Sequence, residues 1–521
     1  MIAGGGVAGL EGALALSRHA PGLVDVEIIA PSPEFVYRPL QVAEPFGVEA
    51  PIRFDLERLA SLAGARLRLD ALREVRPTEG TIGLSSGAEI RYDALLVALG
   101  AQPRDSVPGA INFGTDAGGA GFADLLERIG RPGWRSVAFI VPPAATWTIA
   151  AYELAMLTAA EVRPRGLIGV EISVVSHEPR PLEAFGGDVP ELVVSRLEEA
   201  GIRLHAGVRV TAYRDGALEV EAGDEIPCER AVSLPDLRVA PIEGLPSGAG
   251  GFLPTDVHMH VAGLDGIWAA GDATAFPVKQ GGLAAQQADV AARTIAVRAG
   301  ARVPARPFRP VLRAVLITGR APDFLRSHRG DDDDASHSRE PLWWPPEKLA
   351  GRYLGPLLAA ESAGIEFGEL IDLDPPDDRV WADSQSEAAV ALLLSSADAD
   401  ARRGKFEEAL ASLTLVERLD LVLPPEYTAR RERWRRALDV DGETSSAAAR
   451  VDPGLRSAAA AISDLERRIG RLRQIEAETG GRMKRDLTHL DEGLEQLRKL
   501  SRETGVLDEG ETAHEEGRRA P

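Results

Sequence analysis

Three glycines near the N-terminus have the spacing of a phosphate-binding turn. The stretch 1–3 before them is apolar, the run Leu10–Leu16 after them has a helical pattern, and the glycines are Gly4, Gly6 and Gly9. Such a turn needs glycine because the chain bends tightly, a pyrophosphate approaches the backbone, and the helix packs close to the strand. The first turn of the helix then offers free N–H groups to phosphate oxygens. The spacing therefore predicts a dinucleotide-binding turn.

Two later segments would complete the sheet around such a turn. Residues 92–100 (YDALLVALG) and 266–274 (GIWAAGDAT) each contain an apolar run that ends at a glycine, Gly100 in the first and Gly271 in the second. Asp272 follows directly and would place a carboxylate at the sheet edge, where it can accept a hydrogen bond from a ribityl hydroxyl. Either segment alone is a common pattern, whereas the three signals in this order favour an FAD-binding domain.

The elements that position these residues alternate between strands and helices. Over residues 1–330, short apolar runs alternate with helical stretches and glycine turns, which is typical of α/β domains. The buried strands that we expect are Val26–Ile29, Ala94–Ala98, Val137–Val141, Val170–Val175 and Ile267–Ala269. A chain of 521 residues is too long for one ordinary domain, and its apolar fraction of 44% is enough for a large core.

Together these segments resemble the pyridine nucleotide-disulfide oxidoreductase superfamily, and within it sulfide:quinone oxidoreductases and type II NADH dehydrogenases. Residues 35–43 (FVYRPLQVA) resemble the loop after the second strand of these proteins, and 277–288 (PVKQGGLAAQQA) resemble the segment under their flavin ring. The resemblance covers about residues 1–330. It implies a three-layer α/β fold with two interleaved Rossmann-like dinucleotide-binding domains. The FAD-binding domain would comprise 1–132 and 253–330, and the second, NAD(P)-type domain 133–252.

The resemblance also implies which residues bind FAD. They are Gly4, Gly6, Val7, Ala8, Gly9, Ala30, Arg38, Val75, Gly100, Gly271, Asp272, Gln280, Gly281 and Gly282. Val75 would contact the adenine through its backbone, and the N–H groups of 280–282 would meet the flavin N1/O2 edge at a helix N-terminus. Ala30 stands where relatives have an acidic residue for the ribose, so Ser32, Glu34 or the backbone would hold that hydroxyl.

The second domain lacks the glycines of a nicotinamide site. After its first strand the chain continues with residues 142–153 (PPAATWTIAAYE), in which there is no glycine. Prolines have no N–H to donate, and side chains at these positions obstruct a phosphate. Cys228 is the single cysteine of the sequence, so no redox-active cysteine pair exists. We interpret Cys228 as structural. The sequence argues against ordinary NAD(P)H binding and against thiolate chemistry near the flavin.

Two residues are candidates for a catalytic role. Lys279 lies beside the flavin segment and could tune its redox chemistry; the alternative is an exposed loop cation. Glu153 begins a helix and could relay protons; the alternative is a carboxylate on the helix surface. The histidines show no spacing of metal ligands, and no zinc or iron–sulfur motif is present, so no metal is predicted.

The last third of the chain is expected to be an all-α extension. Residues 331–382 would form a C-terminal segment of the flavin domain and a linker, 383–439 a helical hairpin, 455–504 an antiparallel coiled coil, and 505–521 a disordered tail. The coiled coil predicts self-association or partner binding. The amphipathic stretch Leu342–Ala360 suits either a membrane surface or packing against the flavin domain.

Charge and composition narrow the function further. A net charge of −21 argues against nucleic acid as a partner. Without a signal peptide pattern, we expect a cytoplasmic protein, with peripheral membrane contact as the open alternative. The predicted function is FAD-dependent electron transfer from a small-molecule donor, with a quinone as candidate acceptor. Two alternatives stay open: an NAD(P)H:quinone reductase with an atypical nicotinamide site, and a flavoprotein without turnover that acts as a redox sensor or scaffold through its coiled coil.

Overall fold

A computed structural model describes most of the N-terminal two thirds of the chain and a part of the remainder. The described residues are 1–47, 53–167, 169–328, 335–339, 342–343, 347–363, 394, 397–398, 401, 405–418, 423 and 425–441. Contacts divide the chain into two compact units, Met1–Phe367 and Gly368–Pro521. The predicted coiled coil at 455–504, the tail at 505–521 and residues 364–382 lie outside the described residues.

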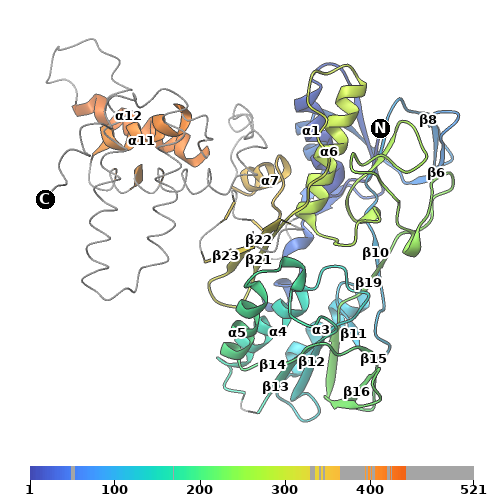
Figure 1. The fold of residues 1–521 in the computed structure, drawn as a ribbon, viewed down its shortest axis with the longest axis vertical. Helices are drawn as coiled ribbons and strands as arrows, with labels where there is room; N and C mark the ends of the chain where they lie inside the picture. Colours follow the sequence, from blue (N-terminus) through green and yellow to red (C-terminus); the bar gives the residue numbers. More distant parts are fainter. Residues whose placement is uncertain are drawn as a thin grey trace, which may run out of the picture. The chain divides into compact units, whose positions relative to one another are not determined.

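The first sheet of the first unit is parallel and carries the glycine turn. Its strand order is β20-β9-β1-β2-β5, and its strands are β1 (Ile2–Ala3), β2 (Val26–Ala30), β5 (Ala65–Leu69), β9 (Leu95–Val97) and β20 (Ile267–Ala269). Helices α1 (Val7–His19) and α6 (Gly281–Arg298) lie side by side against it (Figure 1). Apart from the edge strand β5, which carries Arg66 and Arg68, the strands are almost wholly apolar because both faces of the sheet are covered there.

A three-stranded antiparallel meander forms the third layer of this domain. Its strands are β6 (Leu72–Arg76), β7 (Thr81–Leu84) and β8 (Glu89–Arg91). Val75 and Ile82 of the meander belong to one buried cluster with Ile29 and Val97 of the parallel sheet. The order of layers is therefore helices, parallel sheet and meander, which agrees with the three-layer fold that the resemblance implies.

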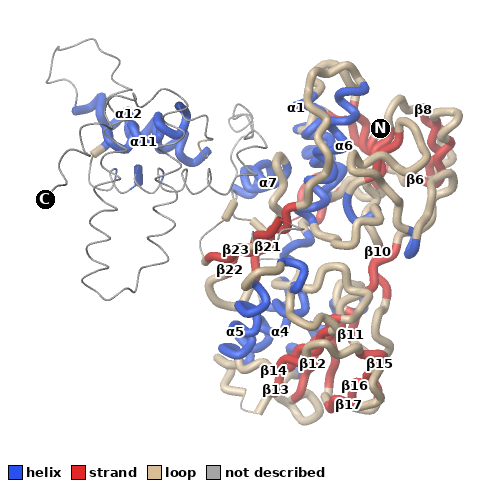
Figure 2. The backbone as a smooth tube through the Cα atoms, in the orientation of Figure 1, coloured by secondary structure: helices blue, strands red, loops and turns tan. Residues whose placement is uncertain are grey.

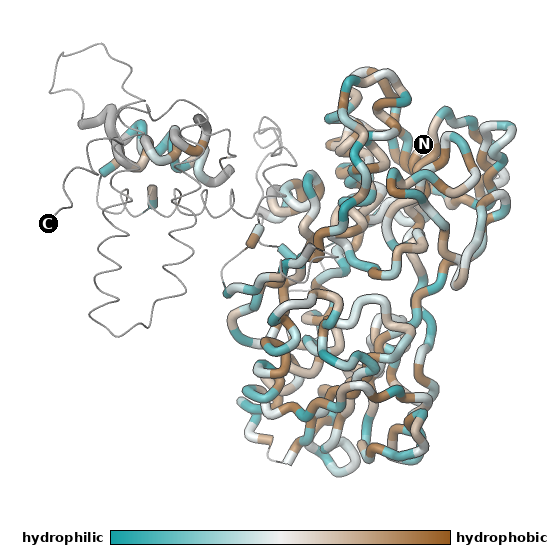
Figure 3. Tube along the Cα trace, in the orientation of Figure 1, coloured by the Kyte–Doolittle hydropathy of each residue, from teal (hydrophilic) through white to brown (hydrophobic). Residues whose placement is uncertain are grey.

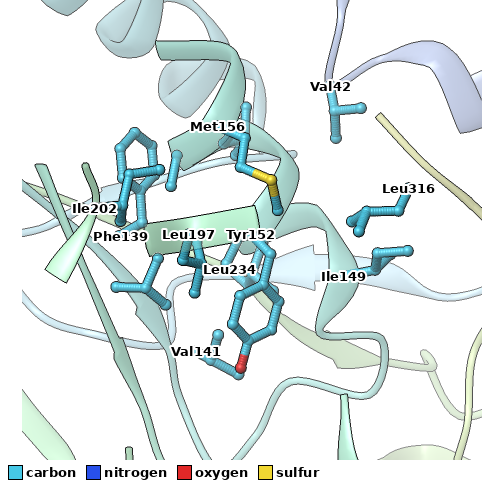
Figure 4. Close-up of a cluster of buried hydrophobic side chains, with 14 of the residues drawn as sticks. Val42, Phe139, Val141, Ile149, Tyr152, Met156, Leu197, Ile202, Leu234 and Leu316 are labelled. Atoms are coloured by element: carbon cyan, nitrogen blue, oxygen red, sulfur yellow. The ribbon is translucent and has the colours of Figure 1, made fainter. Parts of the chain in front are cut away.

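The second domain repeats the parallel arrangement. Its sheet has the order β11-β18-β12-β13-β14, with β11 (Ile111–Asn112), β12 (Ser136–Val141), β13 (Glu171–Ser176), β14 (Arg203–His205) and β18 (Arg230–Ser233). The helices are α3 (Asp116–Arg128), α4 (Ile149–Val162) and α5 (Val189–Ala200), and a hairpin sheet adds β15 (Val210–Arg214), β16 (Ala217–Val220) and β17 (Glu225–Pro227). Tyr152 and Met156 of α4 pack over Phe139 and Val141 of β12 in its core (Figure 4). Hydrophobic stretches, brown in Figure 3, occur in the parallel sheets of both domains.

Two antiparallel strands, β10 (Gln102–Arg104) and β19 (Asp236–Arg238), connect the domains (Figure 2). The α/β fold of interleaved Rossmann-like domains is thus confirmed. The sequence predicted that the first domain extends to residue 132. In the structure, however, β11 and α3 belong to the second domain. The cause is packing: Phe122 of α3 lies in the core with Phe139, at a ring distance of 6.1 Å.

A third sheet follows α6 in the chain. Its strands are β21 (Val311–Leu316), β22 (Asp323–His328) and β23 (Ser336–Ser338), and α7 (Leu354–Ala363) comes after them. Leu349, Leu354 and Leu357 are fully buried, so the described part of the predicted amphipathic segment packs against protein. Among the described residues, no helix is long and apolar enough to cross a bilayer.

The second unit is described mainly through two packed helices, α11 (Phe406–Arg418) and α12 (Pro425–Asp441). Both helices overlap the region 383–439, where the sequence predicts a helical hairpin. The rest of the all-α extension stays a prediction.

Glu11 of α1 binds the start of α7 through hydrogen bonds. Its side chain is fully buried on α1 and accepts hydrogen bonds from the N–H groups of Tyr353 (2.9 Å) and Leu354 (2.7 Å). These N–H groups at a helix N-terminus have no intrahelical partner, and a carboxylate satisfies them well. Burial nevertheless raises the pKa of Glu11 to about 7, while the backbone donors oppose that rise.

The protein should lose stability with rising pH through Glu11. A carboxyl whose folded pKa exceeds its unfolded value contributes stability below the unfolded value, and this contribution is lost as the pH rises through about 7. In Glu11→Gln the free energy of unfolding should therefore vary less between about pH 5 and 8 than in the wild type. Denaturant unfolding across this range measures it, with the exposed Glu57→Gln as control. Parallel pH profiles for Glu11→Gln and wild type would contradict the assignment.

Candidate functional site

The turn between β1 and α1 can be built only from glycine at two of its positions. Gly4 has a φ of +122°, and a Cβ there would lie 2.1 Å from the carbonyl oxygen of Ala98. A Cβ on Gly9 would lie 1.9 Å from the carbonyl oxygen of Gly4. Both glycines therefore allow the first turn of α1 to approach the adjoining strands closely.

Gly6 leaves open space on the outer side of the same turn. It is the N-cap residue of α1 with a φ of −86°, no side chain caps the helix, and a Cβ on Gly6 would meet nothing within 4 Å. The N–H groups of Val7 and Ala8 lie in the first helical turn, where no intrahelical acceptor exists. An open face, free donors and the positive end of the helix dipole fit the pyrophosphate of a dinucleotide.

Asp272 provides a second observation that fits a cofactor. It follows β20, and no hydrogen bond to its carboxylate is found among the described residues. Burial raises the pKa of Asp272, and the positive charges of Lys279 and Arg38 act in the opposite direction. A partly buried carboxylate without a donor is costly. Cofactor hydroxyl groups would satisfy it.

The N-terminus of α6 offers backbone donors close to this carboxylate. The Gln280 side chain accepts from the Leu283 N–H at 2.9 Å and donates to the Arg313 carbonyl at 2.7 Å, which fixes the start of the helix. Gly281 and Gly282 occupy its first turn, where N–H groups lack intrahelical partners. A Cβ on Gly281 would lie 2.9 Å from Leu349, so the segment before α7 covers this helix end.

Lys279 is buried, whereas the sequence left open the alternative that it is an exposed loop cation. Its side chain is only 6% exposed, its ammonium donates to the carbonyl oxygen of Thr274, and its Nζ lies 4.0 Å from the centre of the Phe252 ring. Burial lowers the pKa of Lys279 to about 8, with Asp272 opposing this shift. The backbone N–H of Lys279 also donates to the backbone carbonyl of Thr146 at 3.3 Å, and this hydrogen bond links the two domains.

Comparison with known proteins identifies this arrangement. Residues 143–294 match the family model described as pyridine nucleotide-disulphide oxidoreductase. This match supports the resemblance to that superfamily which the sequence indicates. The chain is a flavin-dependent oxidoreductase, and FAD is its cofactor, as the sequence predicted.

One solved structure supports the fold of this flavoprotein. The sulfide:quinone oxidoreductase of the bacterium Aquifex aeolicus is similar over 65% of this chain and 86% of its own, with 20% identity and a TM-score of 0.60. A ferredoxin reductase of Rhodopseudomonas palustris is similar over 62% of this chain and 80% of its own, with 22% identity and a TM-score of 0.48.

The remaining predicted FAD ligands of the flavoprotein are placed around the turn. Ala30 ends β2 and is buried, with its Cβ 2.9 Å from where a Cβ on Gly5 would lie. Gly100 has a φ of +69° after β9. The Val75 N–H donates to the Glu243 carbonyl at 2.8 Å, so an adenine contact by Val75 would need another backbone atom.

The two candidates for the ribose contact both have partners within the protein. Glu34 pairs with Arg53 at 2.9 Å, and the Ser32 hydroxyl bonds to the backbone of Glu34 at 3.1 Å. Ser32 and Glu34 thus hold their own loop, and backbone groups are left for the ribose. Contacts of all these residues with FAD stay predictions.

The flavoprotein's second domain contains a polar cluster that sequence reasoning missed. Glu178, just after β13, is 8% exposed. Its carboxylate accepts hydrogen bonds from the hydroxyls of Tyr152 (2.7 Å), Ser176 (3.2 Å) and Thr148 (3.1 Å). An acidic residue directly after the second strand of this domain was the available signal, because such a residue holds a ribose in nicotinamide-binding members.

Glu153 is fully buried rather than on the helix surface. One carboxylate oxygen accepts from the Ile317 N–H at 2.9 Å, and the other accepts from Lys348 Nζ at 2.7 Å. Burial raises the pKa of Glu153, and Lys348 opposes that rise. Through these contacts Glu153 joins α4 to the end of β21 and to the segment before α7. This favours a positioning role for Glu153 over a role as proton relay.

Proposed function

We propose that this flavoprotein takes electrons from a small reductant that reaches the flavin directly, and passes them to a quinone. One observation carries the proposal: in the second domain, the protein's own groups occupy the position where a relative would bind a nicotinamide dinucleotide. Nothing in this position resembles the glycine turn of the first domain.

Three features of the second domain disfavour the binding of a nicotinamide dinucleotide. The ribose-binding acid would be Glu178, whose carboxylate is bound by hydroxyls of its own domain. The start of α4 follows Pro142 and Pro143, which have no N–H to offer a phosphate. The carbonyl of Thr146 is bonded to Lys279, so this loop lies against the flavin segment. Binding of NAD(P)H would have to break these contacts, which disfavours the NAD(P)H:quinone reductase alternative.

Thiolate chemistry is disfavoured by the position of Cys228. This residue is the only cysteine of the sequence, it is 4% exposed, and it packs in a cluster with Val107 and Ile140. Burial raises the pKa of its thiol to about 12, so the nucleophilic thiolate is scarce at neutral pH. The donor therefore transfers its electrons without a cysteine of this chain. The fold shared with the Aquifex aeolicus sulfide:quinone oxidoreductase supports a quinone as the acceptor.

When bound, FAD supplies the two-electron chemistry, and the protein supplies binding and electrostatics. Gly6, Val7 and Ala8 would hold the pyrophosphate, and Asp272 would accept from the ribityl chain. Lys279 would hold a positive charge near the flavin segment, and its lowered pKa of about 8 makes proton release inexpensive near neutral pH. Negative charge on a reduced cofactor would be stabilised by this cation and by the α6 N-terminus.

An anaerobic stopped-flow experiment on the purified holoprotein tests the donor. The oxidised flavin is mixed separately with NADH, NADPH, sulfide and duroquinol, and its absorbance is followed. We expect bleaching by duroquinol, through the reverse of the proposed acceptor step, and none by NADH or NADPH. Rapid bleaching by either nicotinamide would overturn the proposal and support the NAD(P)H:quinone reductase.

The acceptor is tested without knowledge of the physiological donor. The flavin is reduced photochemically under anaerobic conditions and then mixed with duroquinone or with NAD⁺. Reoxidation by duroquinone alone is expected. If neither oxidant reoxidises the flavin and no reductant bleaches it, the redox sensor or scaffold alternative replaces the proposed activity.

A further inference from the structure

A pocket rich in arginine lies at the far end of α4 from the predicted flavin segment. Its walls come from the C-terminal ends of α4 and α5, the turn between β21 and β22, and the residue after β23. The arginines that line it are Arg163, Arg196, Arg320 and Arg339. The Lys279 contact is made by the loop before α4, so this pocket is separate from the dinucleotide site.

Apolar side chains form the floor of the pocket. Met156, Ala159 and Ala160 of α4 line it together with Ala200 of α5. The turn approaches α4 closely because Gly319 has a φ of +71°, and a Cβ there would lie 2.4 Å from the Ala160 Cβ. The floor is therefore apolar and fixed by tight packing, whereas the rim is cationic.

The charges of the pocket do not cancel. Arg196 is fully engaged, since it binds Asp323 through two hydrogen bonds of 2.7 and 2.9 Å and Glu199 at 3.0 Å. Arg339 lies 3.9 Å from Asp323. Four guanidinium groups thus share two carboxylates, which leaves two positive charges in excess. The negative ends of α4 and α5 offset about half a charge each, so roughly one positive charge remains.

Arg163 and Arg320 carry this excess. The Arg163 guanidinium donates to the Glu199 carbonyl oxygen at 3.3 Å, at the end of α5, and has no carboxylate partner among the described residues. Arg320 is exposed, and in the same described part of the chain its side chain has no hydrogen bond or ion pair. Arginine binds carboxylates and phosphates in a planar, bidentate manner. A cationic rim above an apolar floor suits an anion that carries a small apolar body.

We infer that this pocket binds a small organic anion, a carboxylate or a phosphate monoester with a short apolar group. Arg163 and Arg320 hold the anionic head, and the alanine floor contacts the apolar part. The net charge of the whole chain is −21, so a general attraction of anions to the protein does not account for such binding. The pocket also adjoins Ile317, whose N–H binds Glu153, so an occupant contacts the turn that this carboxylate holds.

Titration calorimetry of the holoprotein with phenyl phosphate, benzoate and inorganic phosphate tests the inference. We expect phenyl phosphate to bind more tightly than inorganic phosphate, because only the former uses the apolar floor. Arg320→Gln should weaken binding about tenfold. Arg302→Gln, which removes an exposed arginine outside the pocket, should leave the affinity unchanged. Equal melting temperatures would show that Arg320→Gln is folded.

Other outcomes overturn the inference. Phenyl phosphate that does not bind, or that binds Arg320→Gln as tightly as wild type, excludes this pocket. Equal weakening in Arg302→Gln indicates only nonspecific charge attraction. Because binding is read out by heat, the result is independent of any electron donor or acceptor, and failure of the proposed quinone chemistry leaves it unaffected.

Discussion

Replacing Gly6 with alanine should lower the affinity for FAD at least about tenfold while the protein stays folded. The backbone at Gly6 has a φ of −86°, which alanine adopts freely, and the added Cβ meets no protein atom within 4 Å. A loss of affinity must therefore come from the cofactor, because the methyl group points into the space assigned to its pyrophosphate. The measurement is equilibrium titration of the apoprotein with FAD.

Gly119→Ala is the matched control for this variant. Gly119 lies inside α3, and a Cβ there also meets nothing within 4 Å. Alanine should stabilise this helix by about 0.5–1 kcal/mol and leave FAD binding unchanged. Wild-type affinity in Gly6→Ala would show that the pyrophosphate does not lie over this turn.

Lys348→Met should destabilise the protein by about 3–5 kcal/mol, because it leaves the carboxylate of Glu153 buried without a cation. The side chain of Glu153 is 1% exposed and that of Lys348 is 10% exposed, so water compensates little. A cost of this size corresponds to a fall in melting temperature on the order of 10 °C. Thermal unfolding followed by circular dichroism measures it.

The loss of stability caused by Lys348→Met should become smaller as the pH falls. Burial raises the pKa of Glu153, and loss of Lys348 raises it further, because that cation lowers it. A carboxyl with a raised folded pKa contributes stability at low pH that is lost as the pH rises through that folded value. The double variant Glu153→Gln, Lys348→Met should recover much of the stability, because it removes the uncompensated charge. A deficit that is constant with pH, or no recovery in the double variant, would contradict a charge-pairing role for Glu153.

Local signals were enough to predict the parallel sheet and the glycine turn of the first domain. The glycine spacing at Gly4, Gly6 and Gly9 depends on short-range geometry, since a strand, a tight turn and a helix follow one another within a few residues. Gly271 and Asp272 follow an apolar strand in the same local manner. Strands Val137–Val141 and Val170–Val175 were predicted almost to their ends, because strands buried on both faces are continuous apolar runs.

Contacts between distant segments were not predictable in the same way. Glu153 and Lys348 are 195 positions apart, and Glu11 and Leu354 are 343 positions apart. No local pattern distinguishes their side chains from exposed ones. For Lys279 the sequence left an exposed loop position open as an alternative. Its burial involves a contact with the ring of Phe252, which lies 27 positions before it in the chain.

The sequence by itself determined the α/β class, the place of the first glycine turn, and the lack of glycines in residues 142–153, because each depends on residue types and spacing along short segments. Only the tertiary structure decided that Glu178 is bound by Tyr152, that Glu153 pairs with Lys348, and that arginines of α4, α5 and the β21–β22 turn meet in one pocket. These depend on the packing of elements far apart in the chain. A carboxylate's or guanidinium's partner, and so its charge and its chemistry, is set by that packing.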